Sequence, residues 1–144
     1  MLGASSFIFD LARTGDAAAR EPLPVLNGAG DQFSSPSCWS ADGKLLYGNP
    51  LSRSDDVVAY DPATKRYETL PVQGAPVPLR DGHRLLVGWD DAISLFDRQS
   101  GKKKLVLSAQ PDDIAHIFAL SRDEQWIYFS VKSTEADVWL AELR

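Results

Sequence analysis

WSADGKLLYG, residues 39–48, combines an aromatic residue, a serine, an Asp-Gly pair and an apolar run. LSRDEQWIYF, residues 120–129, aligns with it without a gap at an offset of 81, and the serine and the aspartate coincide. LRDGHRLLVG, residues 79–88, lies between them; its Asp-Gly pair matches, and one inserted residue brings residues 85–88 onto residues 45–48. The motif thus recurs about every 40 residues, and a period of this length predicts a repeat architecture.

A short β-rich run that ends in an acidic residue follows each copy of the motif and also opens the chain. Its four copies are FIFD (7–10), VVAYD (57–61), ISLFD (93–97) and VWLAE (138–142). A turn rich in Asp, Thr, Ser, Gly or Lys follows three of the copies and leads to a last strand, which we expect at residues 23–26 in the first unit. Each unit therefore contains up to four short strands.

Four strands per period of this length are the signature of a β-propeller blade. We predict an all-β fold, a partial β-propeller of about three four-stranded blades, in a single domain over residues 1–144. The units are predicted at residues 5–26 (partial), 33–70, 76–107 and 117–143 (without its last strand). Apolar residues occupy both alternating faces of residues 126–131 and 137–143, which predicts strands covered on both sides, as in stacked blades.

The repeated motif itself is interpreted as structural. Asp42 and Gly43 are expected to be the central pair of a tight hairpin turn, because both residue types tolerate positive φ. Trp39 and Leu120 are expected to fill space between blades, and Lys44 is expected to be exposed.

These residues carry a family resemblance. WSADGKLLYG and LSRDEQWIYF resemble the repeat of TolB-like β-propellers, whose motif is Trp or Leu, Ser, Pro, Asp, Gly, Lys or Arg, and then an apolar strand. The closing RDEQWIYFSVKSTEADVWLAEL is similar to the last blade of the propellers at the C-termini of bacterial serine/threonine kinases and winged-helix regulators. Ala41 and Arg122 stand where the repeat usually has Pro. The resemblance covers most of residues 33–143 and implies a fold more than a function, because propellers host unrelated functions.

The composition narrows the classes of partner. The 144 residues contain 20 acidic and 15 basic side chains, a net charge of -5, so we predict no nucleic-acid partner. The one cysteine, Cys38, forms no intrachain disulfide and is interpreted as a packed residue beside Trp39. No apolar run reaches membrane-spanning length, and residues 1–15 lack the segments of a signal peptide, so we predict no membrane insertion. Bacterial periplasm and cytoplasm both stay open.

No residue pattern points to catalysis, a cofactor or a metal ion. The sequence has no Gly-x-Ser-x-Gly element, its histidines, His83 and His116, fall in different units, and no Cys or His spacing suits zinc. Acidic pairs recur at residues 55–56, 90–91 and 112–113. Two of them precede acid-ended strands, so we interpret them as hairpin caps that bond the backbone rather than as Ca²⁺ ligands. We therefore expect a protein that is not an enzyme and binds no cofactor or metal.

The favoured function is that of a non-catalytic protein-binding or structural subunit, a propeller fragment that docks onto a partner protein or a second copy of itself. The alternatives are a ligand-sensing propeller domain of a bacterial signalling protein and the accessory propeller of a peptidase. About three units are fewer than the four to eight blades of a ring, so both ends of the arc would present apolar edge strands for pairing. The predicted interface residues are Phe7, Ile8, Phe9, Val138, Trp139 and Leu140.

Overall fold

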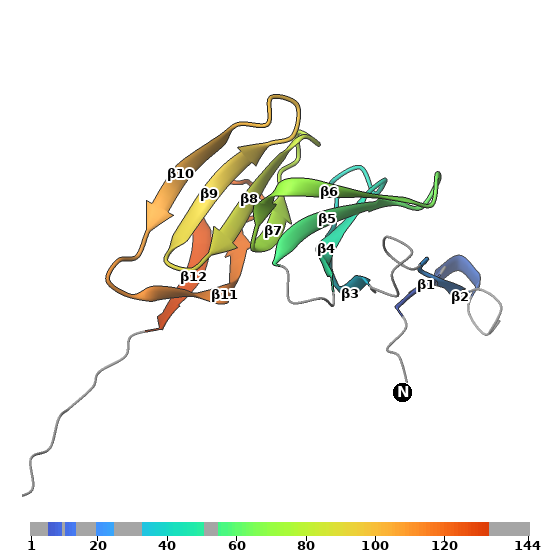
Figure 1. Cartoon of the computed structure of the whole chain (residues 1–144), viewed down its shortest axis with the longest axis horizontal. Helices are drawn as coiled ribbons and strands as arrows, with labels where there is room; N and C mark the ends of the chain where they lie inside the picture. The colour runs from blue at the N-terminus through green and yellow to red at the C-terminus, as the bar shows by residue number, and fades with distance from the viewer. Residues whose placement is uncertain (1–5, 10, 14–19, 25–32, 51–54, 133–144) are drawn as a thin grey trace, which may run out of the picture.

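The computed structural model of the chain describes residues 6–9, 11–13, 20–24, 33–50 and 55–132. Within these ranges the fold is all-β, as predicted, with antiparallel strands in four sheets (Figure 1). The helical structure in this part of the chain is one turn of 3-10 helix, Leu11–Arg13. No helix among these residues has the length and apolar character needed to cross a membrane.

Each sheet is built from strands that are consecutive in the chain and adjacent in space. The first sheet contains β1 (Phe7–Phe9) and β2 (Arg20–Pro22). The second contains β3 (Phe33–Trp39), β4 (Leu46–Pro50), β5 (Asp56–Asp61) and β6 (Arg66–Gln73). The third contains β7 (Ala75–Pro78), β8 (Arg84–Trp89), β9 (Ala92–Asp97) and β10 (Lys103–Ser108). The fourth contains β11 (Asp113–Leu120) and β12 (Ile127–Lys132). The described strands form two four-stranded sheets flanked by two two-stranded sheets, and they do not close a ring.

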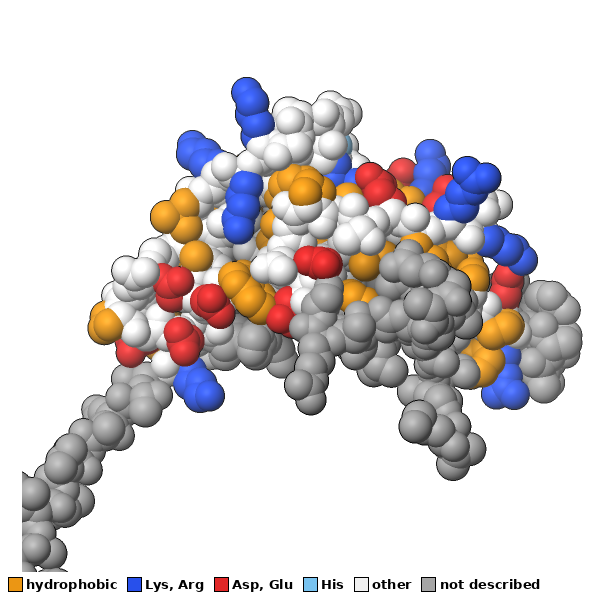
Figure 2. All heavy atoms as spheres, viewed as in Figure 1, with side chains coloured by type: hydrophobic (Ala, Val, Ile, Leu, Met, Phe, Trp, Pro, Cys, Tyr) orange, Lys and Arg blue, Asp and Glu red, His pale blue; other side chains and the backbone are white. Residues whose placement is uncertain are grey.

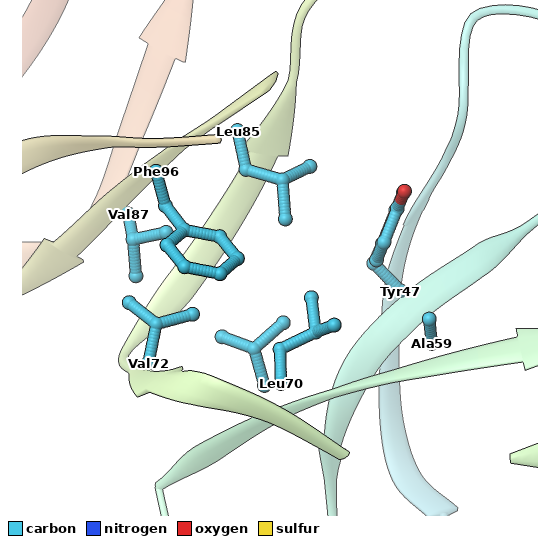
Figure 3. Packing of buried hydrophobic residues seen from close by; sticks show 8 residues of the cluster. Tyr47, Ala59, Leu70, Val72, Leu85, Val87 and Phe96 are labelled. Atoms are coloured by element: carbon cyan, nitrogen blue, oxygen red, sulfur yellow. The ribbon is translucent and has the colours of Figure 1, made fainter. Parts of the chain in front are cut away.

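The second sheet is buried on both faces because its apolar residues alternate toward two neighbouring sheets. On the side of the first sheet, the buried cluster contains Leu46, Val58 and Tyr60, with Ile8, Leu23 and Tyr67 packed against it. On the side of the third sheet, the cluster contains Tyr47, Val57, Ala59, Leu70, Val72, Leu85, Val87 and Phe96. Figure 3 shows Val72 of β6 across from Val87 and Phe96 of the third sheet. Each such side chain contributes about 1.5–3 kcal/mol when fully buried.

The third and fourth sheets stack in the same way. Leu79 of the turn between β7 and β8, Leu86 of β8 and Ile93 of β9 form one cluster with Ile114 and Phe118 of β11. The backbone and the ring come very close at one point, because a Cβ on Gly88 would lie 2.7 Å from the Phe118 ring. The sheets therefore follow one another face to face in chain order.

Arg98, in the turn after β9, connects the second and third sheets at the ends of their strands. Its Nη1 donates to the Tyr47 hydroxyl at 3.1 Å, and its guanidinium carbon lies 5.7 Å from the centre of the Tyr47 ring. Its Nη2 forms an ion pair with the Glu68 carboxylate, and its backbone N–H donates to the His83 carbonyl. These contacts hold the turns of the two sheets together.

The alignment of the middle repeat with one inserted residue is wrong. Leu46 and Leu85 both face the preceding sheet, and Tyr47 and Leu86 both face the following one. The two copies therefore coincide at an offset of 39 without an insertion. A shift of one residue would turn every side chain to the opposite face, and packing excludes it.

The Asp-Gly turn also differs from the expected two-residue hairpin turn. The Ser40 N–H donates to the Leu45 carbonyl at 2.8 Å, and the Gly43 N–H donates to the Ser40 carbonyl at 2.9 Å, so the loop spans residues 41–44. Of the Asp-Gly pair, Gly43 alone has a positive φ, 70°. Asp42 instead accepts a hydrogen bond from the Lys44 N–H, so its side chain caps the loop.

The strand after β1 begins earlier than expected. Residues 20–22 pair with β1, with Phe7 opposite Pro22, whereas the expected strand covered residues 23–26. Leu23 only extends the pairing by one hydrogen bond, from its N–H to the Ser6 carbonyl at 2.9 Å. Leu23 was included in the expected strand because it is apolar. Its side chain packs on the second sheet although the residue follows the strand. Residues 25–26 lie outside the described part of the chain.

Candidate functional site

Aspartates recur in the turns of the repeat, and their hydrogen bonds are local. Asp42 accepts from the Ser40 hydroxyl at 2.6 Å, and Asp123 accepts from the Ser121 hydroxyl in the same way. Those hydrogen bonds lower the pKa of both carboxyls. Burial alone would raise the pKa of Asp81, but hydrogen bonds from Arg84 and from the His83 N–H lower it to about 2. These carboxylates therefore stabilise their own turns.

The turns between the third and fourth strands of each complete sheet repeat a second network. Asp61 accepts from the Ala63 N–H at 2.8 Å and from the Thr64 hydroxyl at 2.9 Å. Asp97 accepts from the Gln99 N–H at 2.8 Å and from the Ser100 hydroxyl at 3.0 Å. The turn chemistry expected from Asp followed by Thr or Ser is present at both places.

In two of the acidic pairs, one carboxylate accepts a hydrogen bond from a side chain of the neighbouring strand. The Gln73 amide donates to Asp56 at 3.2 Å, and the Ser108 hydroxyl donates to Asp91 at 3.1 Å. Both bonds join the two ends of a hairpin. Within the described ranges, no three side chains of the types His, Cys, Asp and Glu are grouped as metal ligands.

Two described side chains that could serve in nucleophilic catalysis, His83 and Cys38, bond to different partners, and the His83 Nδ1 lies 3.5 Å from the Asp81 carboxylate. The His83 Nδ1 lies 3.2 Å from the Asp81 carbonyl oxygen, within the same turn. The Cys38 thiol donates to the Pro76 carbonyl at 3.2 Å, and burial raises its pKa to about 11. His116 belongs to β11, and its side chain is outside the described part of the structure.

Two hollows lie on the described surface near the second sheet. One, of about 510 Å³, lies among the turns at residues 42–45, 61–63 and 82, where carboxylates and a lysine meet solvent. The other, of about 280 Å³, is a groove between β1 and the first two strands of the second sheet. Its lining residues are Phe7, Ile8, Phe9, Ser37, Cys38, Trp39 and Leu46. We call it the β1 groove.

The predicted interface residues of β1 divide between two faces. Ile8 packs against the second sheet. Because successive side chains of a strand point to opposite faces, Phe7 and Phe9 lie on the other face of the first sheet, where each is about half exposed. All three residues also border the β1 groove. The Arg20 guanidinium carbon lies 5.1 Å from the centre of the Phe7 ring. Figure 2 shows hydrophobic side chains uncovered at the end of the molecule that carries β1 and β2. Val138, Trp139 and Leu140 lie outside the described residues.

The fourth sheet is covered on one face only, contrary to the expectation for residues 126–131. Ile127 and Phe129 pack against the third sheet, but Trp126, Tyr128 and Val131 are exposed. Residues 137–143, for which the same expectation was made, are not among the described ones. Tyr128 was not among the predicted interface residues. Its alignment with Tyr47 at the offset of 81 was the available signal, because Tyr47 is buried between two sheets.

Trp39 was expected to fill space between blades. It lines the β1 groove and is partly exposed there.

No protein-family model matches the chain, and no curated protein matches it. The resemblance to TolB-like propellers, and the functions that it implies, therefore stay predictions.

Proposed function

We propose that the chain is a non-catalytic protein-binding subunit, a propeller fragment that makes its contacts through its first and fourth sheets. The observation that carries this proposal is the exposure of aromatic side chains on the outward faces of both terminal sheets, Phe7 and Phe9 on one and Tyr128 on the other. Exposed apolar groups that are gathered on a sheet face favour association with another protein surface.

The propeller arrangement belongs to the same proposal. Four antiparallel sheets that follow one another face to face, with consecutive strands in each, are the arrangement of propeller blades. In such an arrangement every blade needs a neighbour on both sides, because each sheet is apolar on both faces. The two terminal sheets have one described neighbour each, so a partner protein would serve as the other.

A photo-crosslinking amino acid placed at single positions in cells that produce the chain tests this proposal. We expect covalent adducts with a protein when the crosslinker replaces Phe9 or Tyr128. Leu105 is the matched control, because this exposed apolar residue lies on β10, away from both outward faces. Adducts from Leu105 alone, or none from Phe9 and Tyr128, would refute the proposal.

A further inference from the structure

We infer that the terminal sheets of two copies complete each other: β11 and β12 of one copy and β1 and β2 of the other form one four-stranded sheet in the order β11-β12-β1-β2. The inference rests on the proposed function and names the partner as a second copy of this chain. It assigns the exposed residues of the two terminal sheets to one shared interface.

The two terminal sheets contain complementary strands of the repeat. β11 and β12 align with β3 and β4, the first two strands of the second sheet, at the offset of 81. β1 aligns with the third strands, β5 and β9, because an acidic residue follows Phe9 as it follows Tyr60 and Phe96. Among the described strands, β12 and β1 each pair with a single neighbour. Each therefore has an edge at which a further strand can add.

In a complete sheet, two further strands would precede β1, and the β1 groove lies where these two strands would pack. The first sheet covers the Val58 and Tyr60 side of the second sheet, and the groove opens beside it over Trp39 and Leu46. In the interface between the second and third sheets, Leu85 is the counterpart of Leu46 and packs in one cluster with Tyr47. Tyr128 is the counterpart of Tyr47, so the Tyr128 ring of a second copy would enter this groove beside Trp39, which is 44% exposed.

The exposed aromatic residues occupy positions that are buried in both complete sheets. Tyr47 is 1% exposed and Leu86 is 4% exposed at the position where Tyr128 is 73% exposed. In the third strands, Tyr60 is 1% exposed and Phe96 is 2% exposed at the position where Phe9 is 45% exposed. The shared sheet would bury Tyr128 against the second sheet of one copy and Phe9 against the third sheet of the other.

The pairing register follows from the complete sheets. β4 pairs with β5 so that Leu46 is opposite Tyr60 and Tyr47 is opposite Ala59, and β8 pairs with β9 in the same register. The shared sheet therefore places Ile127 opposite Phe9 and Tyr128 opposite Ile8 of the second copy.

The shared sheet joins two copies, because β1 and β12 of one copy lie at opposite ends of the stack (Figure 1). Residues 138–142, which were predicted as the third strand of the last unit, lie outside the described residues, and β1 of the second copy takes that place in the shared sheet. Two copies would contribute two complete sheets each and two shared sheets, about six in all, which lies within the four to eight blades of a propeller ring. Such a ring would leave no sheet with an uncovered apolar face.

Mixing two variants tests the head-to-tail contact. Phe9→Lys and Tyr128→Lys each place a charge at every junction between identical copies, so we expect each alone to weaken association about 100-fold or more. When the two variants are mixed, a pair made of one copy of each has one junction with neither substitution. We expect this mixed pair to associate at least about tenfold more tightly than either variant alone. Leu105→Lys is the matched control and should associate as the unmodified chain does. Thermal melts of each variant establish that it is folded.

A disulfide tests the register. In a Cys38→Ser background, the predicted pairing sets Ser130 opposite Ser6 of the second copy, so Ser130→Cys and Ser6→Cys in separate copies should form an intermolecular disulfide. Arg122→Cys, in an exposed turn, should not crosslink to Ser6→Cys.

Three results would overturn the inference: no gain on mixing, loss of association with Phe9→Lys but not with Tyr128→Lys, or crosslinking that does not depend on the register. If the photo-crosslinker at Phe9 or Tyr128 captures a different protein while mixing gives no gain, this inference fails and the proposed function stands.

Discussion

At the scale of single residues, Asp81 makes the strongest set of turn contacts among the repeat aspartates. It accepts hydrogen bonds from the Arg84 N–H at 2.9 Å and the His83 N–H at 3.1 Å, and it forms an ion pair with the Arg84 guanidinium. Together these bonds hold the pKa of Asp81 at about 2, below its ordinary value of 3.8. The folded state therefore favours the ionised form.

We predict that Asp81→Asn lowers the free energy of unfolding by up to about 2 kcal/mol at pH 7, because a lowered pKa stabilises the folded state wherever the carboxyl is ionised. This stabilisation is complete above about pH 4 and is lost as the pH falls toward 2. Urea unfolding from pH 7 to pH 2 should show the unmodified chain and the variant converging at the acid end.

Asp113→Asn, at an exposed acidic residue of β11, is the control for this measurement. A difference between Asp81→Asn and the unmodified chain that stays constant down to pH 2 would show that ionisation of Asp81 does not stabilise the fold.

Cys38 should react slowly with thiol reagents in the folded chain. Burial raises the pKa of its thiol to about 11, so very little thiolate, the reactive form, is present at neutral pH. We predict that labelling at pH 7.5 is many-fold slower in the folded chain than in urea, and that it accelerates as the pH rises toward 11. Equal labelling rates in the folded and unfolded chain would contradict this description of Cys38.

At the scale of the elements, the close approach of Gly88 to Phe118 sets how tightly the third and fourth sheets stack. Phe118 is itself buried, so its ring has little room to move away from an added methyl group. We predict that Gly88→Ala lowers the free energy of unfolding by about 1–3 kcal/mol, the usual cost of overpacking. Chemical denaturation of the variant and the unmodified chain measures this difference in the free energy of unfolding.

Combining Gly88→Ala with Phe118→Leu removes the ring that the methyl group would meet. The double variant should therefore be destabilised by less than the sum of the two single changes. Additive effects would show that the contact between Gly88 and Phe118 does not limit the stacking.

The elements also show what the sequence could and could not determine. The all-β class and the positions of the hairpin turns were predictable, because Asp, Ser, Thr and Gly recur at fixed places that turns require. The register of β8 was not predictable, since Leu85, Leu86 and Val87 are all apolar. A strand that is buried on both faces has no alternation of apolar and polar residues to show which side chains face which neighbouring sheet. The predicted bounds of the strand after β1 were wrong for a related reason, because Leu23 packs against the second sheet without lying in the strand.

The terminal surfaces were predictable only in part. FIFD identified Phe7 and Phe9 as apolar edge residues, but the sequence could not tell that Ile8 faces the second sheet while its two neighbours face outward. Apolar residues on both faces of 126–131 indicated two neighbouring layers. Whether a second layer is present is a property of the assembled sheets, and Tyr128 is exposed because no described strand covers it.

At the scale of the whole molecule, the central claim is that the two terminal sheets complete each other between copies. Sedimentation velocity of the unmodified chain from nanomolar to about 100 μM tests it most directly, because a standard protein interface holds in this range. We predict a concentration-dependent shift to one species with twice the mass of a single chain, with no larger species, since two copies would close the proposed ring. A folded chain that sediments with the mass of one copy across the whole range would contradict the claim.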